Sequence, residues 1–352
     1  MKKVAIVIFD ITLRSGTERA VCNLSNLLAE KYAVSIISVH SGSGEAAYDI
    51  NNNVQLYHLG VPQAKNKIKR LLSYYKFVKK FGRICNEQNI NIALGTTHAI
   101  NSLLFFFRKI KTVACEHLSY RAAPRSSRIL RRIIYPFLNA VVVLTSSDAK
   151  HYSFHKNVKI IPNSLSFLSE KQSDLTNKEM LAVGRLNYQK GFDLLIDAIS
   201  LIKNECNGWK VKIIGSGEDE NKLKKQIKTL GLENIIKICS PTNTIMQEYL
   251  KAGFYVMSSR YEGLPMVLIE AQSCGLPIVS FDCPEGPSEI IHHNEDGLLV
   301  ENGNIEKLSH ALLELMCDLE KRIQFGRKSS QNISRYKPEN VFTLWDNLFK
   351  II

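Results

Sequence analysis

Two glutamates, Glu262 and Glu270, stand eight positions apart in the otherwise apolar stretch YEGLPMVLIEAQSCGLPIVSFD, residues 261–282. The residues GLP at 263–265 predict the start of a helix, because proline suits a first helical turn. A helical rise of ~1.5 Å per residue would separate the two carboxylates by about 12 Å, comparable to a nucleotide sugar from hexose to ribose. A carboxylate in so apolar a setting needs strong hydrogen-bond donors, which vicinal hydroxyls supply. The alternative is a solvated loop residue at 262 and a charge on a helix face at 270.

Two cations follow a strand-like segment in VGRLNYQKG, residues 183–191. Arg185 and Lys190 would stand in a short loop at the carboxyl end of that strand. Such a pair suits a diphosphate, because arginine forks across two oxygens and lysine acts as a point charge. The segment RSGTER at 14–19 is a further expected junction between a strand and a helix. Its Gly16 would let the backbone pass close to an anion. An ordinary solvated loop and a plain turn explain these two segments about equally well.

Short apolar strands alternate with helical patterns in both halves of the chain. Continuous apolar strands joined by helices predict parallel α/β sheets buried on both faces. We therefore expect two similar domains, 1–163 and 164–335, with a cleft between them and ligands beyond the carboxyl ends of the strands. The predicted strands are 3–9, 34–39, 92–94, 112–115, 140–144, 179–183, 210–214, 235–238, 254–257 and 277–281. The predicted helices are 17–31, 66–88, 193–204, 219–230, 244–252, 265–274 and 304–316, with a further helical pattern after 336.

The length of 352 residues exceeds one ordinary core, and 45% hydrophobic with 22% charged residues is typical of a globular protein. No apolar run approaches the roughly 20 residues that cross a bilayer. The N-terminus meets Asp10 and Arg14 too early for a signal peptide, which predicts a cytoplasmic protein. Eight cysteines without a C-x-x-C pair argue against a zinc site and a disulfide framework. No D-x-D metal motif is present either.

The net charge of +13 is unevenly placed, because residues 1–163 hold 24 Lys and Arg against 8 Asp and Glu, or +16. The first half is therefore expected to meet an anionic surface. The segment 64–83 predicts a basic helix whose apolar face would contain Ile68, Leu71, Leu72, Tyr75, Val78 and Phe81. The predicted contacts with a membrane or an acceptor diphosphate are Lys69, Arg70, Lys76, Lys79, Lys80, Arg83, Arg128, Arg131 and Arg132, with Lys65, Arg121 and Arg125 beside them.

A core-packing helix with a solvated charged face explains the basic helix as well. A nucleic-acid-binding protein could share this charge, but that hypothesis leaves the paired glutamates and the loop cations unexplained. We therefore expect no nucleic-acid partner.

The segments EGLPMVLIE and AQSCGLPIV resemble the retaining glycosyltransferases of family 4, also called glycosyltransferase group 1. The resemblance extends over nearly the whole chain through SGTERA, Glu116-His117, GRLNYQKG, GSGE and DGLLV. It implies an α/β GT-B fold, in which two Rossmann-like domains have parallel sheets that face across a cleft. The run RRIIYPFLNAVVVLTSSD after Cys115-Glu116-His117 looks most like bacterial enzymes that extend lipid-linked oligosaccharides or surface polysaccharides.

The resemblance also implies roles for single residues. Arg185 and Lys190 would hold the donor diphosphate, Glu270 the ribose hydroxyls and Glu262 the hydroxyls of the transferred sugar. The backbone at Gly263, Leu264 and Gly16 would approach the donor. His117 would lie near the sugar and the acceptor, and His117, Glu262, Arg185 and Lys190 would be the catalytic set. The first domain would bind the acceptor, the second the nucleotide sugar, and helix 336–352 would cross back to the first.

The expected activity is transfer of a hexose or N-acetylhexosamine from a UDP-sugar to a polyprenyl-diphosphate-linked oligosaccharide or a surface polysaccharide precursor. Lipopolysaccharide, O-antigen and capsule are the candidate products, and the inner face of the cytoplasmic membrane is the expected place. Arg185, Lys190 and helix amides can stabilise the leaving diphosphate without a metal or another cofactor. Retention by same-face attack is implied by the resemblance, and a double displacement would leave Glu262 as the candidate nucleophile. A nucleotide-sugar epimerase of related fold is the alternative.

Overall fold

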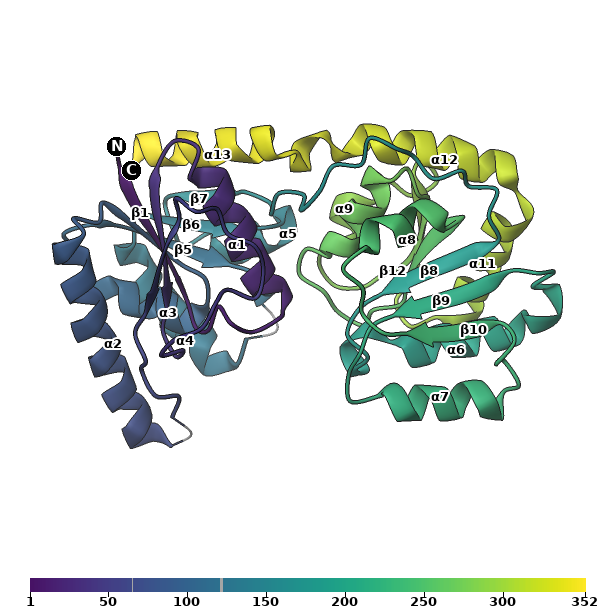
Figure 1. The fold of residues 1–352 in the computed structure, drawn as a ribbon, viewed down its shortest axis with the longest axis horizontal. Helices are drawn as coiled ribbons and strands as arrows, with labels where there is room; N and C mark the ends of the chain where they lie inside the picture. The colour runs from purple at the N-terminus through teal and green to yellow at the C-terminus, as the bar shows by residue number, and fades with distance from the viewer. Residues whose placement is uncertain (65, 121–122) are drawn as a thin grey trace. The chain divides into compact units, whose positions relative to one another are not determined.

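The computed structural model describes residues 1–64, 66–120 and 123–352 (Figure 1). Lys65 and Arg121, which the sequence placed among the basic residues, lie outside this range. The chain forms two compact units. Unit 1 comprises Met1–Ser164 and Pro338–Ile352, and unit 2 comprises Leu165–Lys337. None of the described helices is long and apolar enough to cross a membrane.

Unit 1 contains a parallel sheet with the strand order β3-β2-β1-β4-β5-β6-β7 in the described part of the chain. Its order reverses between β1 and β4, and ligands of such sheets bind beyond the strand ends at that point. The strands are β1 (Lys3–Ile8), β2 (Ala33–Ser38), β3 (Gln55–His58), β4 (Ile92–Gly95), β5 (Lys111–Glu116), β6 (Ala140–Val143) and β7 (Val158–Ile160). The helices are α1 (Gly16–Leu28), α2 (Lys67–Glu87), α3 (His98–Leu103), α4 (Arg125–Ile134), α5 (Ser146–Ala149) and α13 (Pro338–Ile351).

Strand β1 shows why the sheet of unit 1 is covered on both faces. Val4 and Ile6 point into a core that contains residues of α1 and α13, whereas Ala5 and Val7 point into a core with residues of α2 and α3. Successive side chains of a strand alternate between faces, so a continuous apolar run must be buried on both.

The C-terminal helix α13 belongs to unit 1 and is held there by polar contacts as well as by packing. Asp346 accepts hydrogen bonds from Lys31 Nζ at 2.7 Å and from Tyr32 Oη at 2.6 Å. Lys2 Nζ donates to the carbonyl oxygen of Phe349 at 2.5 Å. The chain therefore returns to unit 1 at its C-terminus, where the sequence predicted a helix.

Unit 2 contains a second parallel sheet, with the order β10-β9-β8-β11-β12-β13 among the described strands. Helices α6, α7 and α11 cover one face, and α8 and α9 cover the other (Figure 1). The strands are β8 (Glu179–Val183), β9 (Lys210–Ile214), β10 (Ile236–Cys239), β11 (Phe254–Met257), β12 (Ile278–Asp282) and β13 (Gly297–Glu301). The helices are α6 (Phe192–Leu201), α7 (Glu220–Thr229), α8 (Ile245–Lys251), α9 (Met266–Ser273), α10 (Pro287–Ile290), α11 (Ile305–Cys317) and α12 (Leu319–Asn332).

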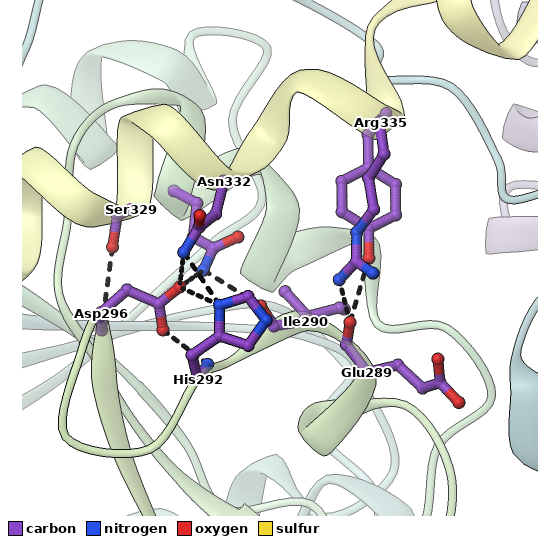
Figure 2. Close-up of polar contacts among 9 residues, drawn as sticks. Glu289, Ile290, His292, Asp296, Ser329, Asn332 and Arg335 are labelled. Atoms are coloured by element: carbon purple, nitrogen blue, oxygen red, sulfur yellow. Dashed lines mark hydrogen bonds and ion pairs between the residues drawn. The ribbon is translucent and has the colours of Figure 1, made fainter.

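The end of α12 is fixed to unit 2 by a buried carboxylate, Asp296 (Figure 2). Asp296 accepts hydrogen bonds from Asn332 Nδ2 at 2.6 Å and from Gln272 Nε2 at 3.1 Å. Next to it, the Arg335 guanidinium donates to the carbonyl oxygen of Glu289. These contacts hold the segment from which the chain leaves unit 2 for α13.

Candidate functional site

Lys190 and Glu262 meet at the point where the strand order of unit 2 reverses. Lys190 lies in the loop after β8, and Glu262 lies in the loop after β11, the neighbouring strand. Lys190 Nζ is 2.6 Å from Glu262 Oε1, which also accepts a hydrogen bond from Ser259 Oγ at 2.6 Å. The side chains are only 19% and 8% exposed. The structure thus brings together two of the predicted site residues, and each neutralises the other.

A second ion pair joins the loop after β11 to the first turn of α6, the helix that follows the loop after β8. Arg260 binds Asp193 through both nitrogens of its fork, at 2.9 and 2.6 Å, and its guanidinium lies 4.1 Å from the ring centroid of Tyr188. Burial opposes the charge on Asp193, but the hydrogen bonds from Arg260 hold the pKa of that carboxyl below its ordinary value. The backbone N–H of Arg260 also donates to the carbonyl oxygen of Gln189 at 2.8 Å. The sequence analysis missed Arg260, although it lies only two residues before Glu262.

Glycines let these loops lie in backbone contact. Gly191 has a φ of +62°, and a Cβ atom there would stand 2.1 Å from the carbonyl oxygen of Ser258. Gly286, in the loop after β12, has a φ of +100°, and its Cβ would stand 2.2 Å from the carbonyl oxygen of Gly263. Only glycine fits both the left-handed backbone and the close approach.

Arg185 and Glu270 flank the Lys190–Glu262 pair in the sequence. Arg185 is exposed, and no ion pair or hydrogen bond of its side chain is found among the described residues. Glu270 lies on α9, is 1% exposed and accepts a hydrogen bond from Tyr249 Oη at 3.1 Å. Glu270 is therefore not a solvated charge on a helix face, which was the alternative interpretation.

The predicted backbone contacts lie at the starts of two helices. Gly263 and Leu264 precede Pro265, and α9 begins at Met266. In unit 1, Gly16 is the first residue of α1, and a Cβ atom there would meet no atom within 4 Å. The fold of unit 1 would therefore tolerate a larger residue at position 16.

His117 follows β5 in unit 1, and both of its ring nitrogens are buried without a hydrogen-bond partner among the described residues. Burial lowers the pKa of His117 to about 4, so the imidazole is neutral at pH 7. The ring lines a small cavity of unit 1 together with Asn163, Ser164 and Trp345. The cavity volume of about 20 Å³ leaves room for roughly one water molecule. His117 therefore has unused hydrogen-bonding capacity.

Arg131 is not part of a basic surface, so the prediction that it contacts a membrane or an acceptor diphosphate is wrong. It is 1% exposed, its Nη2 lies 3.0 Å from Glu116 Oε2, and its Nη1 donates to Tyr152 Oη at 3.0 Å. Glu116 also accepts hydrogen bonds from Tyr135 Oη and Asn101 Nδ2. A buried carboxylate needs such partners, so Arg131 neutralises Glu116 inside unit 1.

The remaining predicted basic contacts are not equally accessible. Arg128 is half-buried, Arg83 is paired with Glu87 at 2.6 Å, and Lys80 donates to the carbonyl oxygen of Leu59. Lys69, Arg70, Lys76, Lys79 and Arg132 are exposed, and Lys80 and Arg83 remain exposed despite their contacts.

The apolar residues of α2 do not form one face, contrary to the sequence prediction. Phe77 and Phe81 are buried against the sheet, and Val78 is half-buried. Four others are exposed, at spacings of three and four residues that place them together on another face. They are Ile68 (78% exposed), Leu71 (72%), Leu72 (56%) and Tyr75 (65%). This exposed set is called the α2 apolar face below.

Residues 166–332 match the family model described as glycosyl transferases group 1. The whole chain is similar to the amylovoran biosynthesis glycosyltransferase AmsD of Erwinia amylovora, with 32% identity over 359 residues and 99% of each chain covered. The chain belongs to the glycosyl transferase group 1 family. It is therefore a glycosyltransferase, as the sequence motifs predicted.

Another relative is an α-1,4-N-acetyl-D-galactosaminyltransferase of Campylobacter jejuni whose name specifies a glycan on PP-undecaprenol. It is 28% identical, with 98% of this chain and 97% of the relative covered. Among solved structures, TarM of S. aureus superposes with a TM-score of 0.84 at 17% identity, covering 99% and 100% of the chains. HepE of Anabaena in complex with UDP gives a TM-score of 0.79 at 16% identity over the full length of both chains. The predicted GT-B fold is confirmed.

Proposed function

We propose that this glycosyltransferase transfers a hexose or N-acetylhexosamine from a UDP-sugar to a polyprenyl-diphosphate-linked oligosaccharide or a surface polysaccharide precursor. The observation that carries the proposal is the Lys190–Glu262 pair at the strand-order reversal of unit 2, together with Arg185 in the same loop as Lys190, whose side chain has no ion pair or hydrogen bond among the described residues. The names of AmsD and of the Campylobacter relative support a polysaccharide or lipid-linked product, and UDP bound to HepE and TarM supports the nucleotide.

In this proposal unit 2 binds the donor and unit 1 binds the acceptor. Arg185 binds two oxygens of the diphosphate, and Lys190 turns its ammonium group toward the same anion. Glu262 accepts hydrogen bonds from hydroxyls of the transferred sugar. Glu270 and the hydroxyl of Tyr249 bind the ribose, and the backbones at Gly16, Gly263 and Leu264 pass close to the donor.

The leaving diphosphate then gains negative charge, which Arg185, Lys190 and the free amides at the start of α9 stabilise without a metal ion. The acceptor hydroxyl attacks from the same face that the diphosphate leaves, and a phosphate oxygen takes its proton, so the anomeric configuration is retained. His117, neutral at pH 7, positions the sugar or the acceptor through its unpaired nitrogens.

We also propose that unit 1 binds the anionic inner face of the cytoplasmic membrane. The α2 apolar face has Lys69, Arg70, Lys76 and Lys79 around it, which is the composition of helices that lie at a lipid interface. Such a surface would place unit 1 next to a lipid-linked acceptor. Sedimentation with anionic vesicles at low salt tests this part, and failure to sediment would contradict it.

The main experiment is turnover of UDP-glucose, UDP-galactose, UDP-GlcNAc and UDP-GalNAc in EDTA, with membrane lipid extract as the acceptor. We expect one UDP-sugar to give free UDP and a glycosylated lipid. Loss of all turnover on chelation would contradict the metal-independent mechanism. A covalent sugar adduct on Glu262 would contradict same-face attack, and a converted sugar nucleotide without a lipid product would contradict transfer itself.

A further inference from the structure

Glu285 is a buried carboxylate without a partner. It lies in the segment CPEGPSE, three residues after the end of β12, and it is 8% exposed. Neither of its carboxylate oxygens has a hydrogen-bond partner among the described residues. Buried polar groups are nearly always paired, because an unpaired carboxylate loses its hydration without compensation. The fold alone therefore gives no reason to keep a glutamate here.

The backbone at Glu285 is unfavourable as well. Its φ is +67°, in the left-handed region that glycine adopts freely and other residues rarely do. Asn294, at a φ of +64°, has a short polar side chain that tolerates this conformation, but a glutamate does not have that advantage. Residues that combine such costs persist where the surroundings impose them, and they gather at binding sites. Glu285 combines two costs in one residue.

In the loop that contains Glu285, the residues before and after Glu285 both lie near the Lys190–Glu262 pair. After Glu285, a Cβ atom on Gly286 would stand 2.2 Å from the carbonyl oxygen of Gly263, the residue that follows Glu262. Before it, burial and the charge of Glu262 raise the pKa of the Cys283 thiol, Lys190 lowers it, and the net pKa is about 12. Cys283 is therefore within electrostatic reach of the pair. The loop after β12 forms part of the same site as the loops after β8 and β11.

We propose that Glu285 accepts hydrogen bonds from hydroxyl or amide N–H groups of a sugar substrate, and that it thereby contributes to the choice of sugar. The inference rests on the proposed transfer reaction. An ionised carboxylate has only acceptors, so its partner must be a hydrogen-bond donor. A diphosphate has no donors and carries the same charge, so Glu285 does not bind the anionic part of the donor. Sugar hydroxyls and the N–H of an acetamido group have the required chemistry.

A buried carboxylate that has no partner before the sugar binds discriminates strongly between sugars. A sugar that lacks the matching donor leaves the buried carboxylate unpaired, whereas a sugar that has it supplies a charge-assisted hydrogen bond. Epimers and deoxy sugars differ in the position of such donors. Glu285 is thus a specificity-determining residue, distinct from Glu262, which already has Lys190 and Ser259 as partners.

The first test is Glu285→Gln, which keeps the size of the side chain and removes the charge. With the UDP-sugar that the wild-type protein turns over, we expect kcat/KM to fall about 10- to 100-fold, the loss of one charge-assisted hydrogen bond. The affinity for UDP alone should stay within about twofold of wild type. A lower rate of donor hydrolysis, measured without acceptor, assigns the contact to the transferred sugar. A lower kcat/KM for the acceptor, with donor hydrolysis unchanged, assigns the contact to the acceptor sugar. Kinetics within about threefold of wild type in both assays would overturn the inference.

The second test is Glu285→Gly, which relieves the left-handed backbone and removes the buried carboxylate. We expect Tm to rise while kcat/KM falls, because the residue serves binding at the expense of stability. Asn294→Gly is the matched control, since it relieves a left-handed residue that is exposed, and it should leave the kinetics unchanged. A lower Tm for Glu285→Gly would show that the carboxylate serves the fold.

The proposed function and the inference about Glu285 can be refuted separately. A wild-type protein that binds no UDP and turns over no UDP-sugar refutes the proposed function, and this inference with it. An active wild-type protein with unchanged Glu285 variants refutes only the inference.

Discussion

The Lys190–Glu262 pair can be tested by its effect on stability before any substrate is known. Lys190→Met removes the ammonium group and leaves Glu262 with Ser259 as its partner. Two charges 2.6 Å apart attract by about 6 kcal/mol at an effective dielectric constant of ~20, of which desolvation removes a large part. Because both side chains are mostly buried, we expect a net loss of about 2–3 kcal/mol in the free energy of unfolding.

A double-mutant cycle with Glu262→Gln isolates the pair. Once Lys190 is gone, the second substitution should cost little, and we expect a coupling energy of about 1.5 kcal/mol or more. The matched control is the pair of Lys224 and Glu220, which has the same 2.6 Å separation but lies exposed on α7. Its coupling should stay below about 0.5 kcal/mol.

The two tryptophans allow each unit to be followed separately. Trp209 is buried in the core of unit 2, and Trp345 is buried in unit 1. In a Trp345→Phe background, fluorescence during urea unfolding therefore reports on unit 2 alone. A coupling energy for Lys190 and Glu262 that equals the Lys224–Glu220 value would refute the reasoning.

The same variants separate the proposed roles of the two residues. If Lys190 binds the diphosphate, Lys190→Met should weaken UDP binding by about 10-fold or more. Glu262→Gln should leave UDP binding nearly unchanged and lower turnover, because its partners would be sugar hydroxyls. Calorimetric titration with UDP measures the first effect, and equal affinities of both variants for UDP would contradict the assignment.

Three other expectations follow from unit 1. Arg131→Met should cost about 3–5 kcal/mol, because it leaves Glu116 buried and uncompensated. Burial already raises the pKa of Glu116, and losing Arg131 raises it further, so the loss of stability should be larger at pH 8 than at pH 5, measured by Trp345 fluorescence. His117→Asn should lower kcat and leave UDP affinity unchanged, since the residue lies outside the unit proposed to bind UDP. Leu71→Ser should reduce sedimentation with anionic vesicles and leave the urea midpoint unchanged, because Leu71 is 72% exposed.

Among the described strands, the sequence predicted all the inner ones but only one of the four edge strands, β10. The α/β pattern located the long apolar strands, which carry a strong signal because they are buried on both faces. The three strands that it missed, β3, β7 and β13, lie at edges of the two sheets. Their segments QLYH, VKI and GLLVE are short and only partly buried. An edge strand has fewer neighbours to bury it, so its apolar pattern is weak.

The errors in the helices have a different physical cause. A helical period shows that a stripe exists but does not show which side meets the core, because distant residues decide that. In the segment RRII, the local sequence predicts that Arg131 is a surface cation. Its burial is explained only by its contact with Glu116 on β5, fifteen positions away. On α2, Ile68 and Phe81 both fit an apolar stripe, yet the sheet covers only Phe81.

The site shows the same division between local and distant information. The motif around Glu262 and Glu270 was visible because its residue types are unusual in an apolar run. Glu285 was not visible, since a glutamate in CPEGPSE looks like a solvated loop residue. Its burial, its backbone conformation and its lack of partners depend on how the loop after β12 lies against Gly263.

Unused hydrogen-bonding capacity marks the site independently of the motifs. Among the described side chains that have two buried polar atoms, His117 and Glu285 are those in which both atoms lack a partner. His117 directly follows β5 and Glu285 closely follows β12, so each unit keeps one such group at the carboxyl end of its sheet. Folding satisfies buried polar groups wherever protein partners suffice. Groups that it leaves unpaired at the strand ends, where parallel sheets bind ligands, are therefore best explained by partners that the substrates supply.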